Sequence, residues 1–293
     1  MPTLRIAAIV QGLHDARNEW RASQSRPRET GAREFPSPDA VGEAVDKIRK
    51  ALFPMRLGPP DLRQENEDYY VGHTLDAALH TLLCQARLEL RFSNVPFESV
   101  EAQATEALRT FADALPDIRR LLDTDVLAAY EGDPAARSVD EVLLCYPGVL
   151  AIIHHRLAHE LYRLGLPLLA RIAAEQAHSR TGIDIHPGAR IGGSFFIDHG
   201  TGVVIGETAV IGERVRIYQA VTLGARRFPK SEDGTLLKGL QRHPTVEDDV
   251  VIYAGATVLG NVTLGKGASI GGNVWLTHDV PAGGSVVQAV SMS

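Results

Sequence analysis

Residues 243–276 read HPTVEDDVVIYAGATVLGNVTLGKGASIGGNVWL, and aliphatic side chains recur in this stretch with a period of six. The repeated positions are Val246, Ile252, Val258, Leu264, Ile270 and Leu276. A strand repeats every two residues and an α-helix about every 3.6, so neither alone gives this period. It is typical of a chain that winds through three short strands per coil, with one aliphatic residue of each repeat pointing inward.

The same period extends upstream in two further blocks. The first contains Ile185, Ile191, Ile197 and Val203, and the second contains Ile205, Ile211, Ile217 and Leu223. The phase slips by two residues between the blocks, and a long interruption follows Leu223. We expect stacked coils over residues 181–285, with about 4.8 Å between equivalent strands.

Residues 1–180 follow a different pattern and predict an α-helical N-terminal domain. Apolar residues recur at helical spacing over 75–92 and over 139–172. Residues 20–40 are rich in Pro, Ser and Arg and predict a mobile linker. Asp133 followed by Pro134 predicts a helix start, with the aspartate as cap. The fold class is therefore α+β, helices first and the coiled repeats second.

Bulk composition excludes several classes of protein. The 293 residues carry a net charge of -6, which argues against a general nucleic-acid binder. The apolar run IAAIV near the N-terminus is too short for a signal peptide or a membrane span, so we expect a cytoplasmic protein that does not enter membranes. Cys84 and Cys145 lie in apolar runs and are expected to be buried thiols.

The phase slip contains a candidate catalytic residue. The segment FFIDHGTGVVIGET (195–208) places His199 just after the aliphatic position Ile197, between glycines, where a regular coil would have an ordinary turn. A structural histidine is the alternative. Asp184 precedes His199 by fifteen positions, and one coil takes about eighteen residues, so the two should lie on adjacent coils. A carboxylate there could orient the imidazole, or it could simply cap the first turn.

The interruption, residues 224–244, reads GARRFPKSEDGTLLKGLQRHP and predicts a protruding loop. Its basic residues are Arg226, Arg227, Lys230, Lys238 and Arg242, and its acidic residues are Glu232 and Asp233. The net charge of +3 suits a polyanionic ligand such as coenzyme A. A solvated loop without a ligand is the alternative.

These motifs together resemble the serine O-acetyltransferases of the hexapeptide-repeat acyltransferase superfamily, in particular the longer bacterial subgroup. The resemblance runs from GDPAARS (132–138) through DHGTGVVIGET (198–208) and RHPT (242–245) to TLGKGASIGGNV (263–274). It implies that the coils form a left-handed parallel β-helix. It also implies transfer of acetyl from acetyl-CoA to the L-serine hydroxyl, giving O-acetyl-L-serine and CoA, the first step of cysteine biosynthesis.

The resemblance also implies roles for individual residues. His199 matches the catalytic histidine and Asp184 its carboxylate partner, with no metal required. Asp133 and Asp198 match the acidic residues that hold the serine ammonium, while Arg242 and His243 match the pair that binds the serine carboxylate. The wall for the pantetheine arm of the co-substrate acetyl-CoA is implied at Gly224, Ala225, Ala254 and Gly272.

Assembly and acceptor identity are further expectations. Proteins of this family form trimers with clefts between neighbouring prisms, and we expect a homotrimer or a dimer of trimers. The chain ends QAVSMS and lacks the terminal Ile with which relatives bind cysteine synthase, so we do not expect that complex. Two alternatives stay open: the same chemistry on another acceptor (homoserine, O-phosphoserine or a sugar), or a non-catalytic scaffold.

Overall fold

The computed structural model describes residues 4–24, 35–93, 95–227, 231, 234–235, 237 and 239–288. They belong to two compact units that divide between Glu34 and Phe35. The first unit contains helix α1 (Ile6–Ser23), which has no buried residue. The predicted linker at 20–40 overlaps the end of α1 and the start of the next helix, and its residues 25–34 lie outside the described residues.

Helices fill the first part of the second unit. They are α2 (Pro38–Leu52), α3 (Pro54–Leu57), the 3-10 helix η1 (Gln64–Asn66), α4 (Glu67–Phe92), α5 (Phe97–Gly132), α6 (Val139–Cys145), α7 (Pro147–Arg163) and α8 (Pro167–Thr181). The helical pattern predicted over 139–172 is divided among three helices, because Pro147 and Pro167 each start a new one. Among the described helices, none is both long and apolar enough to cross a bilayer.

Two sequence-based expectations for this region are wrong. Asp133 does not start a helix: it follows the last residue of α5, and α6 begins only after Ser138, whose hydroxyl accepts a hydrogen bond from the amide of Glu141. Serine takes the capping role there because the chain between the helices turns at residues 134–135. Cys145 is exposed and Cys84 is only partly buried.

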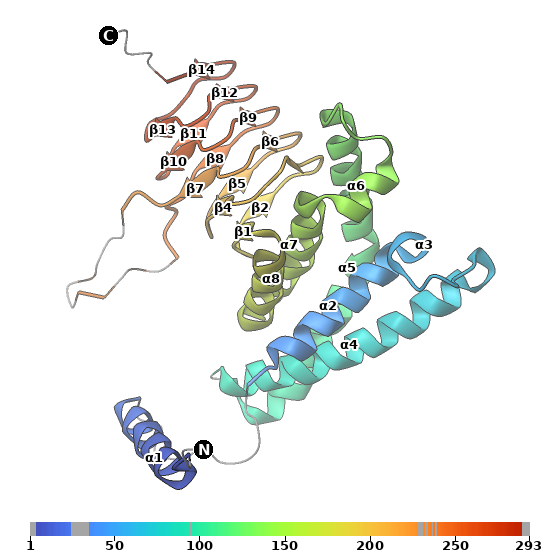
Figure 1. Ribbon diagram of the computed structural model, residues 1–293, viewed down its shortest axis with the longest axis vertical. Coiled ribbons are helices and arrows are strands. Elements are labelled where there is room, and N and C mark those ends of the chain that lie inside the picture. Colours follow the sequence, from blue (N-terminus) through green and yellow to red (C-terminus); the bar gives the residue numbers. More distant parts are fainter. Residues whose placement is uncertain are drawn as a thin grey trace. The chain divides into compact units, whose positions relative to one another are not determined.

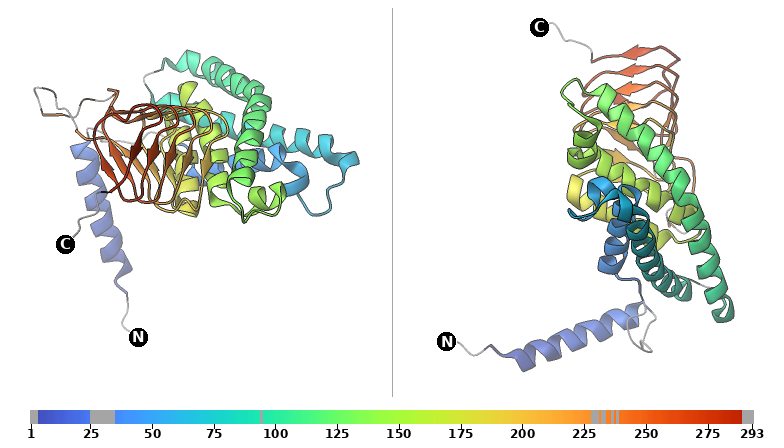
Figure 2. Two further views of the ribbon diagram at one scale, coloured as in Figure 1. Left: turned by 90° about the horizontal axis from the view of Figure 1, so that it is seen from above. Right: turned by 90° about the vertical axis from the view of Figure 1, so that its right-hand side faces the viewer.

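The predicted left-handed parallel β-helix is confirmed. Its strands are β1 (Asp184–Ile185), β2 (Arg190–Ile191), β3 (Phe196–Ile197), β4 (Val204–Ile205), β5 (Val210–Ile211), β6 (Arg216–Ile217), β7 (Thr222–Gly224), β8 (Thr245–Val246), β9 (Val251–Ile252), β10 (Thr257–Leu259), β11 (Thr263–Leu264), β12 (Ser269–Ile270), β13 (Trp275–Leu276) and β14 (Ser285–Val286). Figures 1 and 2 show the coils stacked on one another, with the helices of the second unit gathered around the end that holds β1.

Through β13, every third strand belongs to the same flat face, and β14 joins the face of β12. Face 1 holds β1, β4, β7, β10 and β13; face 2 holds β2, β5, β8 and β11; face 3 holds β3, β6, β9, β12 and β14. The second residue of most strands is buried and points into the prism, as the period of six predicts. The residues between strands form three corners that run along the prism.

The phase slip is visible in the strand register. Asp184 pairs with Val204, whereas Val204 pairs with Thr222, so the first coil is two residues longer than the second. The extra residues lie between β3 and β4. Val203 therefore takes the corner position before β4, equivalent to Val221; it is fully buried, but it is not the strand residue that the period of six predicts. The predicted long loop leaves after β7 and returns at β8.

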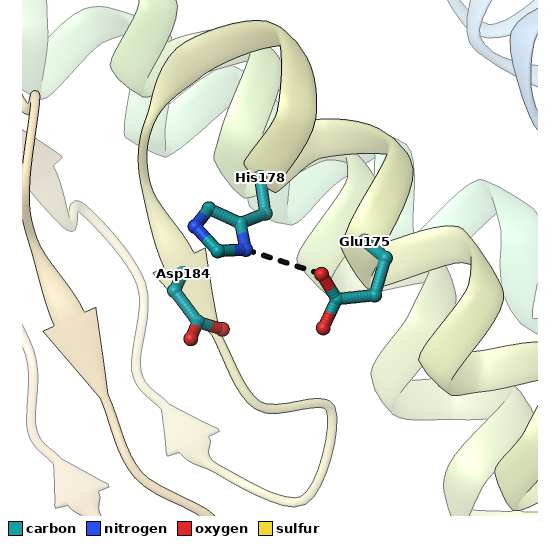
Figure 3. Close-up of side chains that lie close together, drawn as sticks. All are labelled: Glu175, His178 and Asp184. Carbon is teal, nitrogen blue, oxygen red and sulfur yellow. Dashed lines mark hydrogen bonds and ion pairs between the residues drawn. The ribbon is translucent and has the colours of Figure 1, made fainter.

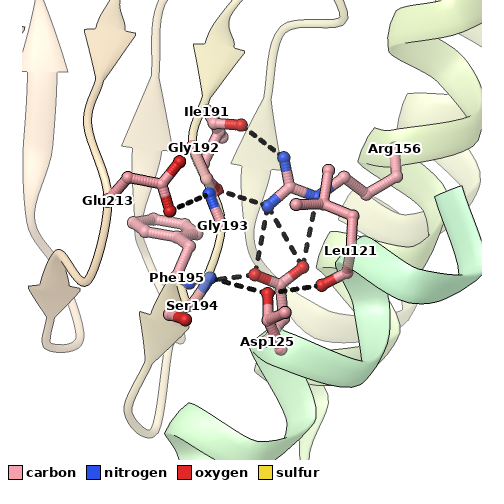
Figure 4. A network of polar contacts seen from close by, with 10 residues as sticks. Leu121, Asp125, Arg156, Ile191, Gly192, Gly193, Ser194, Phe195 and Glu213 are labelled. Atoms are coloured by element: carbon pink, nitrogen blue, oxygen red, sulfur yellow. Dashed lines mark hydrogen bonds and ion pairs between the residues drawn. The ribbon is translucent and has the colours of Figure 1, made fainter. Parts of the chain in front are cut away.

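A buried ion pair joins the helices to the first coil (Figure 4). Arg156 of α7 donates three hydrogen bonds to the carboxylate of Asp125 of α5, both groups being almost fully buried, and also donates to the carbonyl oxygens of Ile191 and Gly192. The amide of Phe195 donates to Asp125 at 2.9 Å. Burial raises the pKa of Asp125 to about 6, although Arg156 opposes that shift. The pair fixes α5 and α7 against the corner before β3.

The helices and the coils share a continuous hydrophobic core. Buried residues run from α2 through α7 and α8 into the inward column of the β-helix. The division into domains at 1–180 and 181–285 stays a prediction, because the residues from Phe35 onward form one compact unit. The change from helix to strand falls between Thr181, the last residue of α8, and Asp184, the first of β1, with Gly182 in a left-handed conformation (φ 69).

Candidate active site

The first polar cluster lies between faces 3 and 1, at residues 198–203; we call it the His199 corner. His199 has φ 59 and Gly200 has φ 91, both in the left-handed region. Other coils place one left-handed residue at this corner, such as Ala220 or Gly255. The two-residue insertion thus adds His199 as an extra corner residue, and 69% of its side-chain surface is exposed.

Asp198, beside it, is buried and paired. Its Oδ2 accepts a hydrogen bond from Arg216 at 2.7 Å, and its Oδ1 lies 3.8 Å from Nδ1 of His199. Arg216 comes from β6 on the next coil, and its guanidinium lies over the rings of Phe196 and Tyr218. The aromatic faces and the carboxylate together hold Arg216 in place.

Asp133 approaches the same corner from the end of α5. Its Oδ2 accepts a hydrogen bond of 2.5 Å from the Tyr146 hydroxyl, and its Oδ1 accepts one of 2.8 Å from the amide of Ala135. The Tyr146 hydrogen bond is the main cause that lowers the pKa of Asp133, and nearby Arg216 and His199 lower it further. The same bond raises the pKa of Tyr146 to about 12.

The charges of this corner favour a cation. Asp133 and Asp198 contribute two negative charges, and Arg216 compensates one of them through its ion pair with Asp198. One negative charge remains when His199 is neutral. A ligand with a single ammonium group would balance it.

Asp184 lies beside two side chains of α8, and its predicted role as the carboxylate partner of His199 stays a prediction. Its carboxylate faces His178 and Glu175 of α8, and the ligand atoms of these three residues lie within 4.8 Å of one another (Figure 3). Glu175 forms ion pairs with His178 at 3.1 Å and with Arg171 at 2.6 Å. Neither a hydrogen bond nor an ion pair joins Asp184 to His199 within the described part of one chain, where the ion pair of His199 is with Asp198.

The second polar cluster lies between faces 1 and 2, at residues 206–209 and 241–244; we call it the His243 corner. Arg242 pairs with Glu207, which also accepts a hydrogen bond from the Tyr162 hydroxyl at 3.1 Å. Gly206 is required here, because a Cβ atom on it would overlap the ring of His243. The returning end of the loop is thereby held against the second coil.

His243 is buried and neutral. The amide of Thr208 donates to its Nδ1 at 3.1 Å, so Nδ1 is the acceptor and the ring proton resides on Nε2. Burial is the main cause that lowers the pKa of His243 to about 4, and Arg242 adds to the shift. The ring can therefore donate a hydrogen bond from Nε2 without carrying charge.

The residues predicted to line a pantetheine arm divide between the two corners. Ala254 and Gly272 follow β9 and β12, in the corner column of His199, and the amide of Asn273 donates to the carbonyl of Ala254. Gly224 and Ala225 lie at the end of β7, on the opposite edge of face 1. A cavity of about 390 Å³ lies beside that edge and is lined by Arg226, Arg227 and Arg242, among others. Lys230 and Lys238 lie outside the described residues.

The predicted site residues therefore form two groups within one chain. The structure brings Asp133, Asp198 and His199 together, and separately brings Arg242 and His243 together. Face 1 separates the two groups, since the His199 corner precedes β4 and the His243 corner follows it.

Sequence reasoning assigned no role to Tyr146, Arg216, Glu207 or Thr208. A signal existed for Arg216: it occupies the outward position of β6, paired with Phe196 of β3, one coil from Asp198. Glu207 and Thr208 end the distinctive segment at the phase slip. For Tyr146 the sequence offers no signal, because its bond to Asp133 depends on how α5 and α7 pack.

Comparisons with known proteins agree with one another. The family model described as bacterial transferase hexapeptide (six repeats) matches residues 243–278. The plasmid serine acetyltransferase of Synechococcus elongatus is 60% identical over 235 residues, which cover 78% of this chain and 74% of that protein. Serine acetyltransferase 1 of Entamoeba histolytica, solved in complex with L-cysteine, is 40% identical with a TM-score of 0.74, covering 86% of this chain and 87% of that one. Soybean serine acetyltransferase, complexed with serine, is 33% identical with a TM-score of 0.55, covering 86% and 98%.

Proposed function

The chain belongs to the serine acetyltransferase family, and we propose that its two polar corners bind the two ends of L-serine while acetyl-CoA supplies the acyl group. The activity itself, acyl transfer to serine, follows from the family. The assignment of residues rests on the charges and exposure of the two corners. The relatives solved with L-cysteine and with serine support a pocket for a small amino acid.

His199 acts as the general base. Its exposed imidazole accepts the proton of the serine hydroxyl as that oxygen attacks the carbonyl carbon of the thioester. The carbon–sulfur bond then breaks, and the imidazolium returns the proton to the departing thiolate. Asp198 lies 3.8 Å from Nδ1, close enough to stabilise the positive charge that forms on the ring. The transfer requires neither a metal ion nor a covalent acyl-enzyme.

The two ends of serine match the two corners in charge. Its ammonium balances the negative charge left by Asp133, Asp198 and Arg216. Its carboxylate is bound by Arg242 and by the Nε2–H of neutral His243. A sugar or another uncharged acceptor would leave both clusters without partners, which disfavours those alternatives.

Acetyl-CoA binds at the edges of face 1, where the two corners lie. We infer that the pantetheine arm lies against residues with small side chains or none, namely Gly224, Ala225, Ala254 and Gly272. The cavity lined by Arg226 and Arg227 offers cations for the phosphates of coenzyme A. Guanidinium groups suit phosphate because they donate paired hydrogen bonds.

One complete site requires two copies of the chain. Serine is too short to span face 1, so the His199 corner of one copy must meet the His243 corner of another. Face 1 supports such packing, since its outward positions Val204 and Trp275 are 38% and 70% exposed and Thr222 and Thr257 beside them are uncharged. An exposed Trp among uncharged neighbours is typical of an interface, and the charged outward residue of this column, Asp184, lies on the first strand of the face. We therefore propose a trimer of parallel prisms.

Mixing two inactive variants tests this arrangement. His199→Ala disables one corner and Arg242→Ala the other, and each homo-oligomer should be almost inactive. After unfolding and refolding together in equal amounts, about one quarter of the sites in a cyclic assembly would combine two intact corners. Activity near one quarter of wild type, measured by release of free thiol from acetyl-CoA, is the expected result. Failure to recover activity in verified mixed oligomers would show that one chain holds the whole site.

A further inference from the structure

Two glycines allow two different helices to touch consecutive residues of β3. A Cβ atom on Gly132, the last residue of α5, would lie 2.8 Å from Cδ1 of Phe196. A Cβ atom on Gly148, in the first turn of α7, would overlap the carbonyl oxygen of Ile197. Phe196 and Ile197 immediately precede Asp198 and His199. Both helices therefore pack directly against the strand that enters the His199 corner.

The hydrogen bond between Tyr146 and Asp133 connects these two contacts. Asp133 follows Gly132 in sequence, and Tyr146 precedes Gly148 by two positions. Tyr146 has an extended backbone (φ -81, ψ 121), as expected for a residue that precedes a proline. Its side chain thus leaves a fixed backbone at the start of α7 and reaches the residue that ends α5.

The hydrogen bonds of Asp133 restrict its side chain. One oxygen is held by the amide of Ala135 and the other by the Tyr146 hydroxyl. Without Tyr146, only the bond within its own turn would remain, and the carboxylate could rotate into solvent. Asp133 is only partly buried, so packing alone does not fix its orientation.

We propose that Tyr146 is a positioning residue for the acceptor: its hydroxyl holds the carboxylate of Asp133 where the ammonium of serine binds. The inference rests on the proposed function, which gives Asp133 that ligand. It adds to that function, because recognition of the amine then depends on the hydrogen bond between Tyr146 and Asp133 as well as on Asp198 of the β-helix. The acyl-transfer step at His199 does not involve Tyr146.

Tyr146→Phe tests the proposal, since it removes one oxygen and keeps the ring. The bond to a charged but partly exposed partner predicts a loss of serine affinity of about five- to ten-fold. The Kd for serine by calorimetry and the KM should both rise, while kcat stays within about two-fold. Tyr69→Phe is the matched control, because Tyr69 is 82% exposed on α4, and its Kd and kcat should equal those of wild type.

A double-mutant cycle separates this inference from the function on which it rests. Asp133→Asn should itself weaken serine binding, and adding Tyr146→Phe to it should cause little further loss, because the hydroxyl acts through the carboxylate. Additive losses in the double variant would overturn the positioning role. So would wild-type affinity in Tyr146→Phe when Asp133→Asn is weakened, and that result would leave the proposed function intact. Wild-type serine affinity in Asp133→Asn would instead refute the ammonium site and the inference together.

Discussion

The two corners of the β-helix hold their histidines in opposite ways. The His199 side chain is 69% exposed on an inserted, left-handed turn, with its nearest carboxylate partner 3.8 Å away. His243 is 6% exposed and accepts hydrogen bonds from Thr208, and its ring closes against Gly206. The imidazole of His199 can reach a ligand and exchange a proton with it, whereas the imidazole of His243 is fixed in one tautomer.

This difference follows from local chain length. The first coil has two extra residues at the His199 corner, and a corner with extra length cannot pack all of its side chains inward. The His243 corner instead receives the returning end of the loop, which places the ring of His243 against Gly206 and Thr208, and burial there lowers the pKa of His243 to about 4. Irregularity in the repeat therefore creates both polar clusters, one by insertion and one by burial.

The largest expected effect comes from His199→Ala. Removal of a general base lowers turnover by about two to four orders of magnitude, because the hydroxyl proton then has no acceptor at the reacting oxygen. By contrast, His243→Ala removes a neutral hydrogen-bond donor and should act mainly on the KM for serine. Steady-state kinetics of the two purified variants make the comparison.

Similar kcat values for the two variants would break the distinction between the corners. Circular dichroism is the control, since both variants must retain the wild-type spectrum. Near-wild-type turnover in His199→Ala would remove the mechanism altogether.

Gly148→Ala is expected to have the next largest effect. It tests whether the packing of α7 against β3 sets the position of the His199 corner. The added methyl would overlap the carbonyl of Ile197 and push α7 away from the strand that leads to His199. A displacement of about 1 Å at a reacting group can cost about 100-fold in rate, so kcat/KM should fall by about that factor. Alanine otherwise favours a helix, so lower helix propensity would not explain the loss.

Gly72→Ala is the matched control for that experiment. Gly72 lies within α4, and a Cβ atom there would meet nothing within 4 Å. This variant should keep wild-type activity. Equal activity in the two glycine variants would show that contact between α7 and β3 does not set the geometry of the corner.

The sequence was most informative where geometry repeats. The period of six predicts the inward residues, the phase slip marks the His199 corner, and the basic loop marks the cavity beside Arg226. Each signal is local, because a repeat imposes the same side-chain direction on every coil. The long interruption after Leu223 likewise corresponds to a break between consecutive strands, β7 and β8.

Contacts between helices and coils could not be predicted in this way. The bond between Tyr146 and Asp133 and the buried pair of Asp125 and Arg156 join segments whose packing no local pattern encodes. The number of residues between two positions predicts the coils on which they lie, but it does not predict the direction of an individual side chain. Asp184 pairs with Val204 of the next coil, and its carboxylate lies near His178 of α8.

Asp184→Asn is expected to have an effect smaller than that of Gly148→Ala. It tests whether the carboxylate of Asp184 orients His199. If the carboxylate orients His199 in the assembled enzyme, kcat should fall by about ten-fold with a smaller change in the KM for serine. His178→Ala is the comparison, because His178 is the neighbour of Asp184 within one chain. Equal losses in kcat and in serine affinity would contradict the orienting role, and an identical phenotype in His178→Ala would assign Asp184 to the α8 cluster instead.

The smallest expected effect is the contribution of His243 to the pH dependence of stability. His243 has a folded pKa of about 4, below the ordinary value of 6.5, so the unfolded chain binds a proton that the folded chain does not. Its contribution to stability is complete above pH 6.5 and is lost as pH falls toward 4. The full shift would correspond to about 3 kcal/mol, which solvent screening at a corner reduces to about 1–2 kcal/mol.

His243→Asn should therefore flatten the pH dependence of stability, because the Asn side-chain oxygen can still accept from Thr208 but does not titrate. Urea unfolding at several pH values between 4 and 7 measures the difference. Buried His154 and His155, whose pKa values are also lowered by burial, will preserve part of the slope. The exposed residue His278 provides the control variant His278→Asn. A slope unchanged by His243→Asn would mean that His243 is accessible to protons in the folded state, and its burial would then not lower its pKa.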